Sequence, residues 1–243
     1  MSQRINHQPI FLLSSTPWRE NSLRIEAFSR DHGRLSLLAR SARTRGSELR
    51  GILMPFVPLS ASWYGKEELK TLHRAEWLGG WPQPRDRALF SGLYINELVL
   101  KLTAREDPAP TVFAALERIF RHLCTQADHH AELRRFEWAL LHTLGLCPDF
   151  RHDADQQPIQ PQQHYLIRPE APPQAVSPEH RPSHGLNISG TVLLGLPDAA
   201  LPDPDSRRQA SKLMRMLIDF RLPEIRSRTV LQQLKQLQKP YSP

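Results

Sequence analysis

Arginine is concentrated in one short stretch of the chain, residues 30–50, which reads RDHGRLSLLARSARTRGSELR. The stretch contains six arginines and only two acidic residues, and small polar residues separate the arginines. A guanidinium group carries five hydrogen-bond donors in a fixed plane and stays charged at physiological pH, so it matches the oxygens of a phosphate. The stretch therefore predicts a phosphate-binding loop, and a solvated surface loop is the alternative.

The candidate phosphate contacts are these arginines and the basic residues that extend their track on neighbouring strands. They are Arg34, Arg40, Arg43, Arg45, Arg50, Lys70 and Arg74. Trp18 and Tyr64 are candidates for stacking on unpaired bases, a contact worth about 1–3 kcal/mol. Packing within the fold is the alternative for both. Trp63 shares a face with three apolar residues, so we expect it in the core.

The net charge of +7 is unevenly distributed along the 243 residues. Residues 1–75 hold 12 Lys and Arg against 6 Asp and Glu, residues 76–205 hold 11 against 17, and residues 206–243 hold 9 against 2. Two basic ends that flank an acidic middle favour a polyanionic partner, most often nucleic acid. For the basic face of the helix expected from residue 206, a solvated surface, a second DNA contact and a partner site all stay open.

Patterns typical of catalysis or metal binding are missing from the sequence. His129 and His130 are adjacent and point in different directions on a helix, unlike the i, i+4 spacing of a helical zinc site. Cys124 and Cys147 form no CxxC pair, which argues against a disulfide scaffold and a cysteine zinc site. We expect a protein without catalytic residues, metal or cofactor. Because no apolar run is long enough for a membrane span, we expect a cytoplasmic protein that does not enter the membrane. The expected nucleic-acid partner would make it nucleoid-associated.

Five short runs between residues 10 and 76 alternate apolar and polar residues, which is the period of half-buried strands. Asp31 and Gly33 mark a turn between the second and third runs. Five strands are too few for a two-sheet sandwich but suffice for a closed barrel of the oligonucleotide/oligosaccharide-binding (OB) type. The sequence therefore predicts such a barrel at residues 1–80.

From residue 86 the apolar residues recur at helical spacing, which predicts helices up to residue 144 and again from residue 205 to 239. Residues 147–204 between them are rich in proline and glutamine, which predicts an irregular, partly disordered subdomain with short strands at residues 165–168 and 186–189. We predict an α+β fold with three parts: the barrel, an all-helical bundle domain formed by residues 81–146 and 205–239, and the proline-rich insertion.

Several tracts resemble the bacterial DNA repair protein family RecO. In the barrel they include Pro17-Trp18-Arg19-Glu20, Gly33-Arg34-Leu35 and Pro58-Leu59. In the helical part they are Gly92-Leu93-Tyr94-Ile95-Asn96-Glu97-Leu98, Arg134-Arg135-Phe136-Glu137 and, near the C-terminus, Arg226-Ser227-Arg228. The two longer helical tracts, in this order and spacing, are the specific ones. The resemblance covers nearly the whole chain and is weakest over residues 150–205.

The resemblance implies a recombination mediator of the RecF pathway that binds single- and double-stranded DNA and anneals complementary strands. With RecR, such a protein helps to load RecA onto DNA coated by the single-stranded-DNA-binding protein SSB. The resemblance also implies a contact with the acidic C-terminal tail of SSB, for which Arg134 and Arg135 are the candidates. The alternatives are an RNA-binding OB module without annealing activity and a metal-dependent nuclease.

Many members of this family carry a four-cysteine zinc element after the third helix. In this chain the corresponding region reads Leu146-Cys147-Pro148-Asp149-Phe150-Arg151-His152 and contains a single cysteine. We therefore expect no structural zinc.

Overall fold

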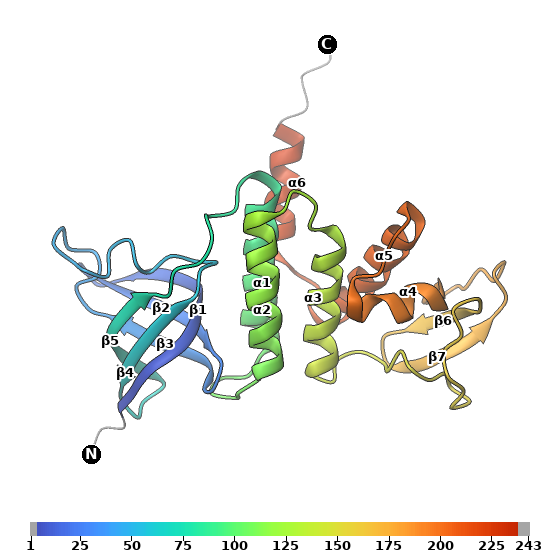
Figure 1. Cartoon of the computed structure of the whole chain (residues 1–243), viewed down its shortest axis with the longest axis horizontal. Coiled ribbons are helices and arrows are strands. Elements are labelled where there is room, and N and C mark those ends of the chain that lie inside the picture. The colour runs from blue at the N-terminus through green and yellow to red at the C-terminus, as the bar shows by residue number, and fades with distance from the viewer. Residues whose placement is uncertain (1–3, 238–243) are drawn as a thin grey trace, which may run out of the picture. The chain divides into compact units, whose positions relative to one another are not determined.

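The computed structural model describes the backbone of residues 4–237 and the side chains of residues 4–233. The chain divides into two compact units (Figure 1). Of the described residues, those at 4–126 and 225–237 form the first unit, and those at 127–224 form the second. These boundaries differ from the three predicted parts, because the proline-rich segment groups with the helices on either side of it rather than standing alone.

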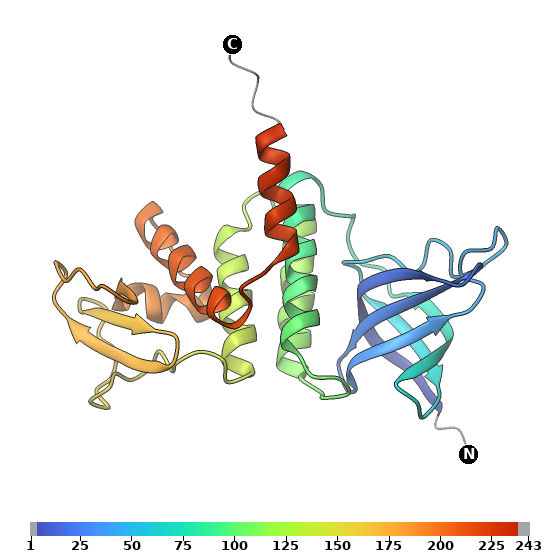
Figure 2. The ribbon, with the colours of Figure 1, turned by 180° about the vertical axis from the view of Figure 1, so that it is seen from behind.

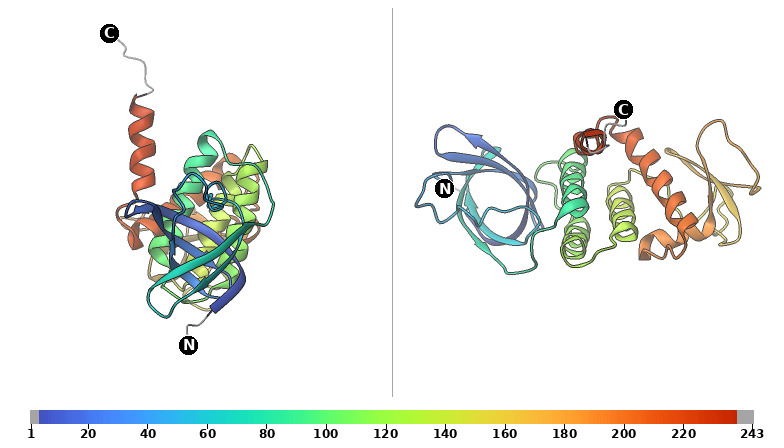
Figure 3. Two further views of the ribbon diagram at one scale, coloured as in Figure 1. Left: turned by 90° about the vertical axis from the view of Figure 1, so that its left-hand side faces the viewer. Right: turned by 90° about the horizontal axis from the view of Figure 1, so that it is seen from above.

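The strands of the first unit form a closed barrel (Figures 2 and 3). The order of neighbouring strands is β1-β2-β3-β5-β4. They are β1 (Arg4–Trp18), β2 (Ser22–Ser29), β3 (Gly33–Ala39), β4 (Leu59–Tyr64) and β5 (Leu69–Trp77). Only β3 and β5 pair in parallel. The long strand β1 pairs with two neighbours: its first part pairs with β4 and its second part with β2. The predicted OB-type barrel in an α+β chain is confirmed.

The barrel buries apolar residues on both of its faces. Leu37 and Trp63 lie in the interior, and both are buried as the alternating pattern predicts. On the outside, the ring of Phe11 lies 5.1 Å from that of Phe113 and 5.2 Å from that of Phe120. Both partners belong to α2 (Pro110–Thr125). The outward apolar residues therefore form a second core between the barrel and its helices.

The tract at residues 92–98 lies on α1 (Asp86–Leu102) and anchors this helix to the barrel. Gly92 faces Phe56 so closely that an added Cβ would lie 2.8 Å from the phenyl ring. The Asn96 side-chain amide donates a hydrogen bond to the Leu12 carbonyl (3.4 Å), next to the irregularity in β1. A small residue and a polar residue in this tract thus serve the docking of α1.

Two further polar residues of the tract hold α6 (Arg226–Leu237) in a contact termed the α1–α6 clasp. The Glu97 carboxylate accepts hydrogen bonds from the backbone N–H groups of Arg226 and Ser227, both at 2.8 Å. The Arg228 guanidinium donates to the Tyr94 hydroxyl at 2.8 Å and lies over its ring. The clasp brings together two tracts of the family resemblance that are far apart in the sequence.

The position of Glu97 at a helix N-terminus explains its ionisation. Burial alone raises the pKa of this carboxyl, but hydrogen bonds from Lys101, Ser227 and Arg226 outweigh burial and lower the pKa to about 2. The unpaired N–H groups at the start of a helix carry partial positive charge and favour an anion there. Glu97 therefore stays ionised and supplies the N-terminal cap of α6.

The second unit contains α3 (His130–Thr143), a three-stranded antiparallel sheet and three further helical segments. The strands are β6 (His164–Arg168), β7 (Ala171–Val176) and β8 (Leu186–Ser189), in the order β7-β6-β8, and the segments are α4 (Gly190–Gly195), the 3₁₀ helix η1 (Leu196–Asp198) and α5 (Pro204–Arg221). The expectation of partial disorder is corrected, because the proline-rich segment forms a sheet that includes an unpredicted strand, β7. Pro172 and Pro173 fit in β7 because it is an edge strand, where a missing N–H breaks no second ladder.

Candidate nucleic-acid interface

Strands β1, β2 and β3 present their outward side chains in rows, because residues opposite each other in an antiparallel pair face the same side. We term this surface the outer face of β1–β3. In OB barrels the face of strands 2 and 3, with the adjoining loops, binds oligonucleotides. Four rows follow one another along this face, starting at the turn between β1 and β2. They hold Trp18 and Ser22, then Thr16, Arg24 and Leu38, then Ser14, Glu26 and Ser36, then Phe28 and Arg34.

The arginine loop, residues 40–50, lies beside the turn that joins β1 to β2, at the Trp18 end of this face. The backbone N–H of Arg43 donates to the Asn21 carbonyl at 3.0 Å, and its guanidinium donates to the Glu20 carbonyl at 3.0 Å. Three further arginines are exposed and make no ion pair with any residue that the structure describes: Arg40, Arg45 and Arg50. The loop therefore places unneutralised positive charge at the open end of the face.

The opposite end of the face is covered by the α1–α2 loop, residues 103–109. Gly33 at the start of β3 allows the close approach, since an added Cβ would lie 2.2 Å from the Asp107 carbonyl oxygen. Next to it, the backbone N–H of Glu106 donates to the Arg34 carbonyl at 3.0 Å. The loop thus continues the sheet for one residue beyond the short pairing of β3 with β5.

Two of the predicted phosphate contacts, Arg34 and Lys70, lie under this loop. The Arg34 guanidinium donates to the Glu26 carboxylate (3.3 Å) and to the Thr103 carbonyl (3.2 Å), and its side chain is only 14% exposed. Lys70 is buried and pairs with the Glu106 carboxylate. The Arg34 side chain points outward from the barrel as predicted. Lys70 does not, because it pairs with interior Leu37 and shares the inward face with Leu72. Neither residue is an exposed part of the track.

The remaining candidates divide between two walls of the barrel. Trp18 is half-buried on the outer face of β1–β3, next to the arginine loop. Arg74 is exposed on β5, where it pairs with Glu76, and Tyr64 at the end of β4 has its ring 6.5 Å from that of His73. The structure therefore brings Trp18 together with the arginine loop and places Arg74 and Tyr64 on the β4–β5 wall.

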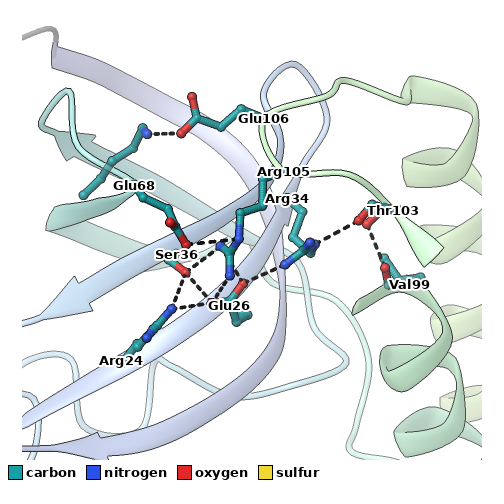
Figure 4. A network of polar contacts seen from close by, with 10 residues as sticks. Arg24, Glu26, Arg34, Ser36, Glu68, Val99, Thr103, Arg105 and Glu106 are labelled. Atoms are coloured by element: carbon teal, nitrogen blue, oxygen red, sulfur yellow. Dashed lines mark hydrogen bonds and ion pairs between the residues drawn. The ribbon is translucent and has the colours of Figure 1, made fainter. Parts of the chain in front are cut away.

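Sequence reasoning missed three basic residues at this surface. Arg19 is exposed in the β1–β2 turn. Arg24 and Arg105 both donate to the Ser36 hydroxyl, at 3.4 and 2.8 Å (Figure 4). The alternation of β2 places Arg24 outward just as that of β3 places Arg34 outward, so the sequence contains the signal for Arg24. Arg105 carried no such signal, because it belongs to a loop that follows a helix.

Comparison with known proteins identifies the family to which these features belong. The chain matches the model described as Recombination protein O N terminal over residues 1–81, and the model described as Recombination protein O C terminal over residues 87–229. The chain belongs to the RecO family. The resemblance inferred from the sequence tracts is therefore confirmed.

Relatives named DNA repair protein RecO are similar to the chain over almost its entire length. The protein from Neisseria gonorrhoeae is 53% identical over 96% of this chain and 96% of its own length. The protein from Chromobacterium violaceum is 42% identical (98% and 99%), and that from Dechloromonas aromatica is 39% identical (98% and 99%). The chain is thus a DNA repair protein of the RecO family with an OB-type barrel, and such proteins are not known as enzymes.

The structure pairs both RecO-like arginines of α3 with acidic residues of the same helix. Arg134 lies 3.0 Å from the carboxylate of buried Glu137. Arg135 lies 3.7 Å from Glu132 and donates a hydrogen bond to the Pro197 carbonyl at 2.7 Å. Each guanidinium is therefore held in place within the second unit, and only part of its donor set is left for an SSB tail.

The region that carries zinc in many RecO proteins does not fit zinc in this chain. Its only cysteine is Cys147, and burial raises the pKa of the Cys147 thiol to about 12, which disfavours the thiolate that binds zinc. Among residues 4–233 we find no group of three or more His, Cys, Asp and Glu side chains arranged to hold a metal ion.

Membrane insertion through a helix finds no support in the fold. Within the described part of the chain, every helix is too short or too polar to cross a bilayer.

Proposed function

We propose that the chain binds single- and double-stranded DNA through the outer face of β1–β3 and the arginine loop, and that it anneals complementary strands. The observation that carries this proposal is the group of exposed arginines at the open end of an OB-type barrel in a family of DNA repair proteins. Arg40, Arg45 and Arg50 have no acidic partner among the described residues, so they are available to phosphates. Trp18 supplies an aromatic surface beside them.

Annealing by such a surface needs no catalytic residue. Two strands repel each other through their phosphates, and a basic surface that displaces their counterions lowers this repulsion. The contacts are to the backbone, so they carry no sequence preference and leave the bases free to pair. We therefore propose a non-enzymatic role, which the chain would carry out in the cytoplasm, at the nucleoid.

The mediator role extends the proposal to protein partners. It assigns to the chain an interaction with RecR, and binding of the acidic SSB tail near Arg134 and Arg135, so that RecA is loaded onto SSB-coated DNA. Support comes from the family membership and from the two guanidinium groups on α3, which match a carboxylate-rich peptide in charge. Charge matching alone is weaker support than the open face of the barrel.

An annealing assay tests the proposed function. Complementary labelled oligonucleotides, bare or coated with SSB, are mixed with the protein, and duplex formation is followed on a native gel. We expect faster annealing of both substrates. Equal affinity for single-stranded DNA and RNA without annealing would instead support an RNA-binding module, and DNA cleavage on addition of a divalent metal would support a nuclease.

A further inference from the structure

A single carboxylate organises the covered end of the outer face. Glu26 of β2 lies between three guanidinium groups, and Figure 4 shows them converging on it. Arg34 and Arg105 donate hydrogen bonds to Glu26 at 3.2–3.3 Å, and an Arg24 nitrogen lies 3.6 Å from its carboxylate. The Ser36 hydroxyl donates to the same carboxylate. One negative charge therefore positions three positive ones.

The three arginines differ in how many of their guanidinium donors remain available to a ligand. Arg34 is 14% exposed, and its contacts to Glu26 and Thr103 hold the α1–α2 loop. Arg24 is 36% exposed, and its contacts to Glu26 and Ser36 both pass through one terminal nitrogen. Arg105 is 33% exposed and turns its Nε toward the Glu68 carboxylate at 3.1 Å. Arg24 and Arg105 thus still present donors to solvent.

We infer that Arg24 and Arg105 form a phosphate-binding site, oriented by Glu26 and Ser36, that takes one phosphate of a DNA backbone. Both guanidinium groups contact the same Ser36 hydroxyl, so they are close enough to share one anion. The inference rests on the proposed function, since it names the residues that continue the DNA contact from the arginine loop along β2. Arg105 would be the contribution of the helical part of the first unit.

Glu68 indicates where the anion binds. Its side chain belongs to the turn between β4 and β5, is 65% exposed, and already places a carboxylate oxygen against the Arg105 Nε. An exposed ion pair of this kind contributes only about 0–1 kcal/mol, so it is easily displaced. The Glu26 carboxylate is not easily displaced, because it is only 13% exposed and has several donors around it. A phosphate that replaces Glu68 would meet a cluster with three arginines and one fixed carboxylate.

The shared phosphate makes a specific prediction for salt dependence. We compare single-stranded oligonucleotide binding by fluorescence anisotropy across a salt series for wild type, Arg24→Gln, Arg105→Gln and the double variant. The double variant should lower the slope of log K against log salt by about 0.7, the value for one phosphate on a single strand. Two independent contacts would lower it by about 1.4. Arg87→Gln, which removes the same charge as either single variant but at an exposed position of α1, should leave the slope unchanged.

A second comparison removes the competing carboxylate and leaves the buried contacts intact. Glu68→Gln should strengthen DNA binding by about two- to fivefold, since Arg105 no longer has to leave an ion pair. Glu67→Gln is the matched control, because only the backbone carbonyl of Glu67 binds Lys70. In the Arg105→Gln background the two variants should bind DNA equally.

Three results would overturn the inference. One is a wild-type slope in the double variant while alanines in the arginine loop abolish binding, which would leave the proposed function standing. Another is equal binding by the Glu68→Gln and Glu67→Gln variants with Arg105 present. Failure of the wild-type protein to bind any DNA would refute the site and the proposed function together.

Discussion

The α1–α6 clasp predicts that Glu97→Gln will loosen α6 while the barrel stays folded. Glu97 makes two charge-assisted hydrogen bonds of 2.8 Å to the first turn of α6. Glutamine keeps one acceptor oxygen and loses the charge, and its NH₂ group meets a backbone N–H that cannot accept a hydrogen bond. We therefore expect the variant to lose one hydrogen bond and the favourable charge at the helix N-terminus.

The size of the effect follows from two linked quantities, since the hydrogen bonds from Arg226 and Ser227, together with one from Lys101, are also what lowers the pKa of Glu97. A hydrogen bond to a charged group contributes about 1.5–3 kcal/mol to stability. The lowering of the Glu97 pKa from 4.5 to about 2 corresponds to roughly 3 kcal/mol of preference for the ionised form. Since one bond survives the substitution, we expect α6 to lose about 2–3 kcal/mol. Amide hydrogen exchange in residues 226–233 should then be faster by roughly 30- to 150-fold.

The same substitution predicts a dependence on pH. Folding lowers the pKa of Glu97, so its contribution to stability is complete above the ordinary value of 4.5 and is lost as the pH falls toward 2. The exchange rates of the variant and the wild type, compared at the same pH, should therefore converge between pH 4.5 and pH 2. Hydrogen exchange read by mass spectrometry separates α6 from the rest of the chain, which a global unfolding curve does not.

Glu117→Gln provides the control for the clasp. Glu117 also pairs with a residue four positions later, Arg121 at 3.0 Å, but both side chains are exposed on α2. Such a pair contributes about 0.3–0.5 kcal/mol, so exchange in α6 should not change. If Glu97→Gln protects α6 as well as Glu117→Gln does, the two hydrogen bonds of Glu97 do not hold the helix and the reasoning fails.

Three other predictions address DNA, metal and the SSB tail. Replacing Arg40, Arg43 and Arg45 by alanine should flatten the salt dependence of DNA binding by about 0.7–0.9 per lost contact, and an unchanged slope would place the DNA elsewhere. Elemental analysis of the purified protein should find no stoichiometric zinc, and a chelator should leave Tm unchanged; one zinc per chain would contradict the lack of fit around Cys147. Arg134→Lys keeps a charge beside its acidic neighbour but loses the guanidinium fork, so titration with an SSB-tail peptide should show affinity weaker by about 1 kcal/mol. Unchanged affinity would remove α3 from the site.

Alternation in the sequence was enough to predict the barrel and the outward direction of Arg34, but Lys70, predicted outward, lies on the inward face with Leu72. Alternation also did not predict which outward side chains are exposed. Arg34 points outward and is covered, because the α1–α2 loop returns to it across 69 residues. Period-2 alternation predicts the direction in which a side chain points. Its coverage by a loop is a tertiary contact, which alternation does not predict. The exposed track is therefore shorter at one end than the sequence predicts, and Arg24 and Arg105 were overlooked there.

The polar residues of α1 show a similar limit. The sequence favours a structural role for Tyr94, Asn96 and Glu97, in which hydrogen bonds fix the helix against the barrel. Asn96 has this role, since it binds a carbonyl of β1. Tyr94 and Glu97 bind α6 instead. Residue type predicted that these positions make polar contacts, but the partner lies about 130 residues further along and leaves no local signal.

The unpredicted strand β7 has a different cause. Its sequence, APPQAV, contains two prolines, which ordinarily count against a strand. The register of β7 against β6 shifts between Leu166 and Arg168, and the prolines lie opposite this irregularity. The rule against proline applies to central strands, and the sequence does not reveal that β7 has only one neighbour.

The clasp also sets an order of events during synthesis on the ribosome. The barrel, α1 and α2 are complete in the sequence by residue 126, but the helix that Glu97 caps begins only at Arg226. At roughly 5–20 residues per second, the first unit waits about 5–20 s for its last helix. During that interval the Glu97 carboxylate and the Tyr94 ring have no helix to bind, and a chain that stops early never receives one. The first unit is thus completed only after the whole second unit has been synthesised. The clasp can therefore form only in a chain in which both units have been translated.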